Sequence, residues 1–162
     1  MVLNEYPFAI WIDTSIGFKQ VNISQLFEDA RQMDIIGVDG KTAISRRTLP
    51  RTFYHFDEQP CTFINLTEIQ SGFIIARATP FVVENILKPW VACALLLDCM
   101  VPRDGYLPYR NCDEKGEVHE VYGECHKFDE SVWGILLHRA YGDDISKHML
   151  TYGGRYIYPI GL

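Results

Sequence analysis

A short apolar run near the start of the chain, Phe-Ala-Ile-Trp-Ile-Asp at residues 8–13, constrains the fold more than any other feature. Its aromatic and β-branched residues are followed by Thr-Ser-Ile-Gly, which breaks the run, so the pattern predicts a strand that ends at Asp13. A strand that is almost continuously apolar is usually covered on both faces, which is typical of the parallel sheets of α/β proteins. We therefore expect the chain to open with a buried strand that carries a carboxylate at its end.

The next segments give the opening of the chain a β-α-β pattern. Residues 22–25, Asn-Ile-Ser-Gln, have the form of a capping box, and apolar residues continue at helical spacing as far as Met33. A second short strand is predicted over residues 35–38, where Asp39-Gly40 bounds it. One amphipathic helix should therefore connect two strands.

The middle of the chain is less regular. Residues 41–60 show no sustained period and predict an irregular surface segment, and two further strand-like runs follow at 61–66 and 72–77. Thr79-Pro80 predicts the start of a helix, because proline is tolerated at the first helical position. Pro89 should then kink or break that helix, since it lacks the N–H that the helix needs.

Four features organise the rest of the chain. Residues 91–99 contain too many consecutive apolar residues for a surface helix, so we expect them to be buried. Residues 102–124 are polar and predict a long loop of the kind that is often functional. A helix should begin near Asp129 as N-cap and stop at Gly142, and the tail at 155–160 predicts a late edge strand. The whole pattern predicts an α/β fold whose mixed, mainly parallel sheet has helices on both faces.

Charge and hydropathy exclude some classes of partner. The net charge of −6 comes from acids and bases that are mixed along the chain, and no basic run is longer than Arg46-Arg47, so nucleic acid is not an expected partner. The longest apolar run, residues 91–97, is too short to span a bilayer. Any contact with a membrane would therefore go through a segment that is absent from this chain.

The cysteines and the glycosylation sequons indicate which cellular compartments are compatible with the chain. The five cysteines include no Cys-X-X-Cys pair, which disfavours zinc-ribbon and thioredoxin sites and leaves paired disulfides open. Asn22 and Asn65 each begin an Asn-X-Ser/Thr sequon, which would accept a glycan in a secretory compartment.

Two groups of residues are candidates for binding a ligand. Asp13, at the end of a strand, could hold a divalent cation that bridges two phosphates, or it could simply cap the following turn through its side chain. Gln70, Ser71 and Gly72 place small and polar groups just before an apolar strand, so a ligand could approach their backbone, although Gly72 could equally be a turn glycine.

A third group surrounds the start of the last helix. His126 and Asp129 lie there with further carboxylates, and could supply a base, a metal ligand or a pair that binds a hydroxyl. The alternative is that Asp129 is a helix cap and His126 an ordinary surface residue. Zinc binding at Cys125-His126 is disfavoured, because too few partners stand at ligand spacing.

Taken in order, these segments resemble a glycosyltransferase of the GT-A nucleotide-sugar type, and more closely a little-characterised invertebrate family of glycosyltransferase-like proteins. The resemblance rests on four motifs that together cover most of the chain. They are WIDTSIGF at 11–18, IQSGFIIAR at 69–77, ILKPWVACALLLDCMVP at 86–102 and CHKFDESVWGILL at 125–137.

The resemblance implies a role for each candidate residue. Asp13 would hold a divalent metal, Mn²⁺ or Mg²⁺, and the pyrophosphate of the donor. Gln70, Ser71 and Gly72 would line the donor sugar and the acceptor, and Asp129 with His126 would position or deprotonate the acceptor hydroxyl.

The sequence departs from the family pattern in two ways. The usual acidic motif has two carboxylates, whereas Thr14 and Ser15 follow Asp13 here, so metal affinity should fall. Such domains also begin with elements that bind the nucleotide base, whereas this chain opens almost directly at the acidic strand. We therefore expect residues 1–162 to form a single glycosyltransferase-like domain that lacks the N-terminal nucleotide-binding part. A truncated chain, loss of catalysis, or a second chain that supplies the missing half would each account for this.

Three functions follow as hypotheses. The first is transfer of a sugar from a nucleotide sugar to a glycan or protein acceptor, in the secretory pathway or Golgi lumen of the full-length protein. The second is a non-catalytic carbohydrate-binding or interaction module derived from such an enzyme, with Tyr106, Tyr109 or Tyr122 exposed beside the polar loop. The third is a structural fragment without a stable fold of its own.

Overall fold

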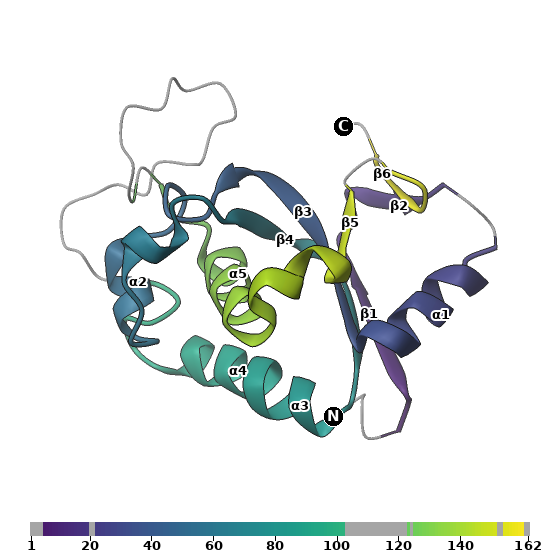
Figure 1. The fold of residues 1–162 in the computed structure, drawn as a ribbon, viewed down its shortest axis with the longest axis horizontal. Helices are drawn as coiled ribbons and strands as arrows, with labels where there is room; N and C mark the ends of the chain where they lie inside the picture. The colour runs from purple at the N-terminus through teal and green to yellow at the C-terminus, as the bar shows by residue number, and fades with distance from the viewer. Residues whose placement is uncertain (1–4, 20–21, 103–122, 124, 152–153, 161–162) are drawn as a thin grey trace.

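The computed structural model describes residues 5–19, 22–102, 123, 125–151 and 154–160 (Figure 1). Tyr106, Tyr109 and Tyr122 lie outside these described residues. The described part forms an α/β structure in which helices cover both faces of a four-stranded sheet.

The main sheet has the strand order β1-β4-β3-β5. Its long central strands are β4 (Thr67–Arg77) and β3 (Ile35–Ala43), which pair antiparallel. The strand β1 (Phe8–Ile12) pairs antiparallel with β4, and the short β5 (Met149–Thr151) pairs parallel with β3. The sheet is therefore mixed, but most of its pairings are antiparallel.

A second, smaller sheet lies at one end of the molecule. It pairs β2 (Ile16–Phe18) antiparallel with β6 (Ile157–Pro159), so the predicted late strand does form. Figure 1 shows this pair above α1, at the far end from α2.

The helix α1 (Ser24–Met33) covers one face of the sheet. Its Leu26 and Ala30 are fully buried in a core that they share with apolar residues of β3 and β4. The side chain of Asn22 accepts a hydrogen bond from the Ser24 N–H at 3.0 Å, although the N-cap residue itself is Ile23. The helix predicted from apolar spacing is confirmed, but the predicted capping box does not form, because the N-cap residue makes no side-chain hydrogen bond and the Gln25 side chain bonds Asp29.

The helix α5 (Phe128–Tyr141) packs against the other face. Its Trp133 and Leu137 are fully buried, and Trp133 stacks at a tilt on Trp90 with ring centroids 4.9 Å apart. Trp90 belongs to α4 (Lys88–Leu95), which backs α5 on its outer side. Gly142 ends α5 with a φ of 52°, as predicted.

The segment before α4 stays helical through its proline. The short α3 (Pro80–Val82) begins at Thr79, whose hydroxyl accepts from the Val82 N–H at 3.3 Å, and the π-helical turn η3 (Val83–Leu87) leads directly into α4. The predicted helix start is confirmed. Pro89 lies at the start of α4, just after the π-helical turn η3, so the predicted break does not occur and the irregularity beside the proline takes the form of that π-turn.

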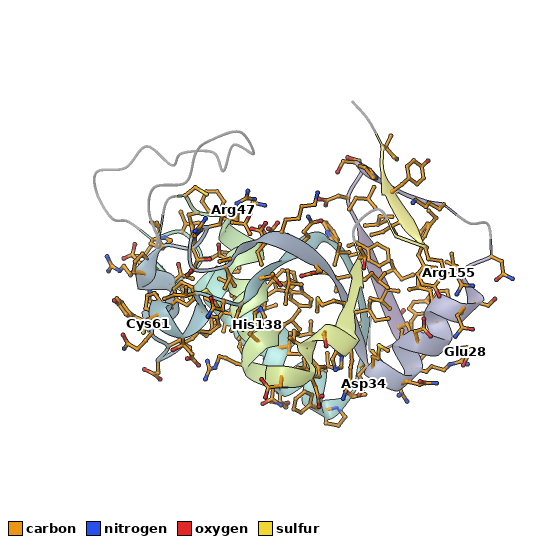
Figure 2. The ribbon with its side chains drawn as sticks, turned by 45° about the horizontal axis from the view of Figure 1, so that its top comes forward. Glu28, Asp34, Arg47, Cys61, His138 and Arg155 are labelled. Atoms are coloured by element: carbon orange, nitrogen blue, oxygen red, sulfur yellow. A yellow bond between two sulfur atoms is a disulfide. The ribbon has the colours of Figure 1, made fainter. Side chains whose placement is uncertain are left out.

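A third part of the core lies beneath short helices at the other end of the molecule. Here α2 (Pro50–Tyr54) and the 3-10 turn η2 (Pro60–Phe63) bury Phe53 and Phe63 against α5 and a disulfide between Cys93 and Cys99. Figure 2 shows Cys61, in η2, at the end of the molecule away from Glu28 of α1. A last 3-10 turn, η4 (Gly142–His148), joins α5 to β5.

The strand β4 contains an irregularity in its middle. Its partner β3 advances two residues, from Ile36 to Val38, while β4 moves five, from Ile75 back to Gln70. As a result Ile69 and Ile74 both face the α5 side, although they differ in parity. Such a bulge changes which side chains point to which face of the sheet.

Three predictions about strands and surface were wrong. The sheet is not mainly parallel, and β1 is an edge strand whose Trp11 is 61% exposed, rather than a strand covered on both faces. Residues 61–66 form the end of the 3-10 turn η2 and the turn that follows it, rather than a strand. Residues 41–60 are not an irregular surface, since they include the end of β3, the helix α2 and the buried Phe53.

Residues 91–99 are not buried as a whole. The disulfide holds Cys93 and Cys99 inside. Between them, Leu95 at the end of α4 and Leu96 and Leu97 in the following turn have exposures of 83%, 56% and 62%. The helix α4 ends at Leu95, so the apolar run does not continue along a helix that could bury it. Among the described residues, no helix is long and apolar enough to cross a membrane.

These exposures predict that two leucines differ in their contribution to stability. Leu95→Ala should change the free energy of unfolding by no more than about 0.5 kcal/mol, because its side chain is already in water. Leu137→Ala, in the core, should cost about 2–5 kcal/mol. Chemical denaturation of both variants measures this, and equal losses would contradict the burial described.

Candidate functional site

The structure places Asp13 directly against Gly72. The Asp13 N–H donates to the Gly72 carbonyl at 2.8 Å, which extends the β1–β4 pairing by one residue. A Cβ added to Gly72 would lie 3.0 Å from Asp13 Oδ2, so the carboxylate lies over the bare backbone of β4. Two of the predicted site residues, far apart in the sequence, are thus brought together.

The surroundings of this pair are open to solvent. Asp13 is exposed, and Gln70 and Ser71 are half-buried beside Gly72 in the bulged part of β4. The turn after β1 is closed by a backbone bond from the Ile16 N–H to the Asp13 carbonyl at 3.0 Å. Because the backbone closes the turn, the carboxylate is not required for it and can face a ligand.

His126 lies in a second neighbourhood, beside the start of α5, where it is only 4% exposed. The Leu49 N–H donates to its Nδ1 at 3.3 Å, so that nitrogen carries a lone pair and the proton is on Nε2. Nε2 lies 3.0 Å from the Met100 carbonyl, to which it donates. His126 is therefore neither a surface residue nor a free base, because the described bonds engage both ring nitrogens.

Asp129 is exposed in the first turn of α5 but is not its N-cap. The helix begins at Phe128 with Lys127 as N-cap, so the predicted cap is wrong by two residues. The Asp129 carbonyl accepts from Trp90 Nε1 at 3.3 Å, which ties this turn to α4. The Asp129 carboxylate thus stands at the positive end of the helix dipole, in reach of solvent.

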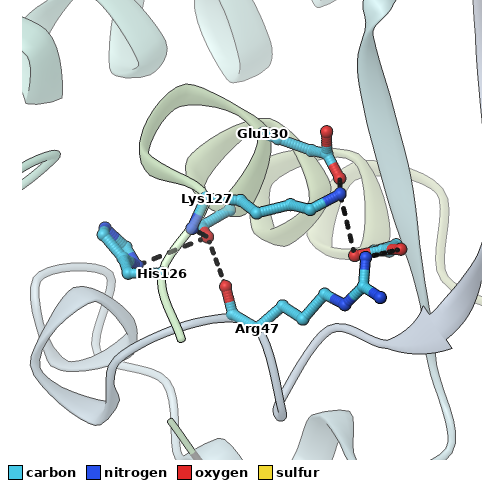
Figure 3. Close-up of polar contacts among 6 residues, drawn as sticks. Arg47, His126, Lys127 and Glu130 are labelled. Carbon is cyan, nitrogen blue, oxygen red and sulfur yellow. Dashed lines mark hydrogen bonds and ion pairs between the residues drawn. The ribbon is translucent and has the colours of Figure 1, made fainter. Parts of the chain in front are cut away.

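A cluster of four charged side chains lies beside His126, and the sequence did not predict it (Figure 3). Glu68 of β4 is 4% exposed, and its Oε1 accepts from Arg47 Nη1 at 3.1 Å. Lys127 Nζ lies 2.9 Å from Glu130 Oε1 and 3.7 Å from Glu68 Oε2. We call Arg47, Glu68, Lys127 and Glu130 the α5 charge cluster.

Burial controls the protonation of the two acids in the α5 charge cluster. Removal from water raises the pKa of Glu130 to about 7, since the attraction of Lys127 offsets the desolvation only in part. Desolvation also raises the pKa of Glu68, against the opposing effects of Lys127 and Arg47. Glu130 can therefore gain or lose a proton near neutral pH.

Backbone pairing holds this second neighbourhood in place. The N–H groups of Gly123, Cys125 and Lys127 donate to the carbonyls of Ser45, Arg46 and Arg47, at 3.0, 3.4 and 3.2 Å respectively. Ser131 Oγ adds a bond to the Arg47 carbonyl at 2.9 Å. The segment that leads into α5 is thereby fixed to the turn after β3.

The two neighbourhoods share the strand β4 but lie apart on it. Glu68 and Gly72 are four residues apart, which corresponds to about 13 Å along an extended strand. The structure therefore brings Asp13 to Gly72, Ser71 and Gln70, and separately gathers His126 and Asp129 around the start of α5. The expectation that all of them meet in one cleft stays a prediction.

The described residues contain no group of three or more His, Cys, Asp or Glu side chains that could hold a metal ion by themselves. Asp13 offers one carboxylate. Mg²⁺ is commonly held by one or two carboxylates together with substrate phosphates, so Asp13 fits a metal that arrives with a diphosphate rather than one held by the protein alone.

Comparison of the chain with protein-family models, with curated proteins and with solved structures finds no match.

His126 should matter for stability. His126→Ala leaves the Leu49 N–H and the Met100 carbonyl without their partner, which should cost about 1–3 kcal/mol in the free energy of unfolding. The matched control is His55→Ala, since His55 is exposed. Chemical denaturation gives both values, and an unchanged stability in His126→Ala would contradict a structural role.

Glu130 should make stability depend on pH. Its pKa is raised from 4.5 to about 7 in the folded state, so the folded state binds the proton more tightly than the unfolded one. Its stabilising contribution is complete below pH 4.5 and is lost as the pH rises through about 7. Denaturation at several pH values should show Glu130→Gln gaining stability relative to wild type as the pH rises, by at most on the order of 3 kcal/mol.

The matched control for this prediction is Glu84→Gln, because Glu84 forms a lysine pair of similar spacing in a solvent-exposed position. Its difference from wild type should be small, because an exposed ion pair contributes little to stability. A difference for Glu130→Gln that does not change with pH would contradict the raised pKa of Glu130.

Proposed function

We propose that this protein is glycosyltransferase-like and transfers a sugar from a nucleotide-sugar donor to a hydroxyl acceptor. The observation that carries the proposal is the contact between Asp13 and Gly72, which puts an exposed carboxylate over bare backbone beside half-buried Gln70 and Ser71. These are the residues to which the family resemblance assigns the donor. Its support is that two motifs 59 positions apart, at residues 13 and 72, converge on one surface.

In this proposal each residue has a limited task. Asp13 would hold a divalent metal, which would supply positive charge to neutralise the leaving diphosphate. Gly72 lets the donor approach the backbone of β4, because it has no side chain in the way, and the polar groups of Gln70 and Ser71 orient the sugar. Holding the reactants in place in this way is a large part of what an active site contributes.

Asp129 is a better candidate than His126 for the proton of the acceptor hydroxyl. The Asp129 carboxylate is exposed in the first turn of α5, whereas the described bonds of His126 occupy both of its nitrogens. In this proposal His126 is a positioning residue, which holds the segment before α5 against Leu49 and Met100.

We further propose a secretory or Golgi compartment for the protein. The Cys93–Cys99 disulfide supports this, and Cys125 is also disulfide-bonded. Disulfides persist mainly in oxidising compartments.

One observation favours the second function, a non-catalytic interaction module. Leu95, Leu96 and Leu97 project from the turn that the disulfide closes, and together with Met100 and Val101 they line a hollow of about 320 Å³. Exposed apolar groups of this kind are typical of surfaces that contact other molecules. Such a module would bind sugar without binding a nucleotide.

Calorimetric titration with UDP, with and without Mn²⁺, tests the proposal. We expect Mn²⁺-dependent binding to the wild-type chain and its loss in Asp13→Ala. Gly72→Ala should also weaken it at least several-fold, because the added methyl group would lie 3.0 Å from Asp13 Oδ2 and 3.1 Å from Ile16 Cδ1.

The matched control is Asp144→Ala, which removes an exposed carboxylate from η4. It should leave binding unchanged. A well-folded wild-type chain that binds no UDP, or one whose binding survives Asp13→Ala, would count against the donor site, and sugar binding alone would favour the interaction module.

A further inference from the structure

The sequon at Asn65 lies at the surface, where a bulky group such as a glycan can be attached without disturbing the core. Asn65 is exposed in the turn between η2 and β4, next to Ile64, which is itself 37% exposed. This turn follows Cys61, at the end of the molecule away from α1 (Figure 2). A glycan attached there would extend into solvent.

We propose that Asn65 carries an N-linked oligosaccharide when the chain is made in the secretory pathway. The co-reactant is a lipid-linked oligosaccharide diphosphate. A bond forms between Asn65 Nδ2 and the anomeric carbon of the first sugar, the bond from that carbon to the diphosphate oxygen breaks, and the amide nitrogen loses one proton as the lipid diphosphate leaves.

The fold also indicates when the modification takes place. The third residue of the sequon, Thr67, donates its hydroxyl to Asp39 Oδ1 at 2.7 Å, and its carbonyl accepts from His138 Nε2 at 2.7 Å. Thr67 is also paired with Ala43 in the β3–β4 ladder. The motif requires that hydroxyl, which Asp39 engages at the surface of the folded protein, so we expect modification to be faster before β4 pairs with β3.

The Thr67 hydroxyl then has two successive roles. It completes the sequon in the unfolded chain, and it bonds Asp39 in the folded protein. The inference depends on the compartment and not on sugar transfer by this protein, so either can fail without the other. The disulfides at Cys93–Cys99 and Cys125 agree with the same compartment.

The test is expression of the full chain with a secretion leader in a eukaryotic cell. The mass of the peptide that contains Asn65 is measured before and after enzymatic removal of N-glycans, which converts a linked Asn to Asp. We expect a glycan on wild type, its complete loss in Asn65→Gln and Thr67→Val, and its retention in Thr67→Ser, which keeps the hydroxyl.

The matched control is Asn85→Gln. Asn85 is exposed in η3 but is followed by Ile and Leu, so it begins no sequon, and its replacement should leave the Asn65 glycan unchanged. An unmodified Asn65 in a secreted, disulfide-bonded wild-type chain would overturn the proposal.

The order of events can be tested in vitro. Unglycosylated protein is incubated with an oligosaccharyltransferase and lipid-linked oligosaccharide, either folded or reduced and unfolded. Modification of Asn65 should be at least tenfold faster in the unfolded chain. Equal rates would overturn the requirement for a free Thr67 hydroxyl.

Discussion

The close approach of α5 to β4 is the contact on which the rest of the structure depends. Gly134 leaves room for it, because a Cβ there would lie 3.7 Å from the Ile69 nitrogen of β4, an ordinary contact, but only 2.5 Å from Ile44 Cδ1, whose side chain would have to shift. With the helix seated this close, its first turn brings Lys127 and Glu130 to Glu68. Both the α5 charge cluster and the exposed position of Asp129 follow from this one contact.

The local elements could be predicted from the sequence better than their arrangement. Apolar spacing identified α1, whose Leu26 and Ala30 are fully buried, and Thr79 correctly marked the start of a helix. The antiparallel direction of β1 could not be predicted, because an apolar run does not specify which strand it will pair with. Its pairing with β4 joins segments that are more than sixty residues apart, with β2, α1 and β3 among the elements between them.

For the candidate site too, single residues could be predicted from the sequence, but their arrangement in space could not. Asp13 and Gly72 were singled out from their own motifs, and the structure adds that they touch. The α5 charge cluster was missed because its members come from three separate segments, and nothing near Glu68 in the sequence indicates burial. A Cβ added to Gly40 would lie 2.2 Å from Glu68 Cγ, so the buried position of Glu68 depends on a glycine in the neighbouring strand β3.

The exposed Trp11 points to a consequence of the position of β1. This strand bonds β4 along one side, and among the described residues no strand pairs with its other side. The main sheet can therefore grow beside β1, since unpaired N–H and carbonyl groups there offer a template for another strand. A strand added at that edge would run next to Asp13. This carboxylate would then lie between β4 and the added strand, without any change in the present fold.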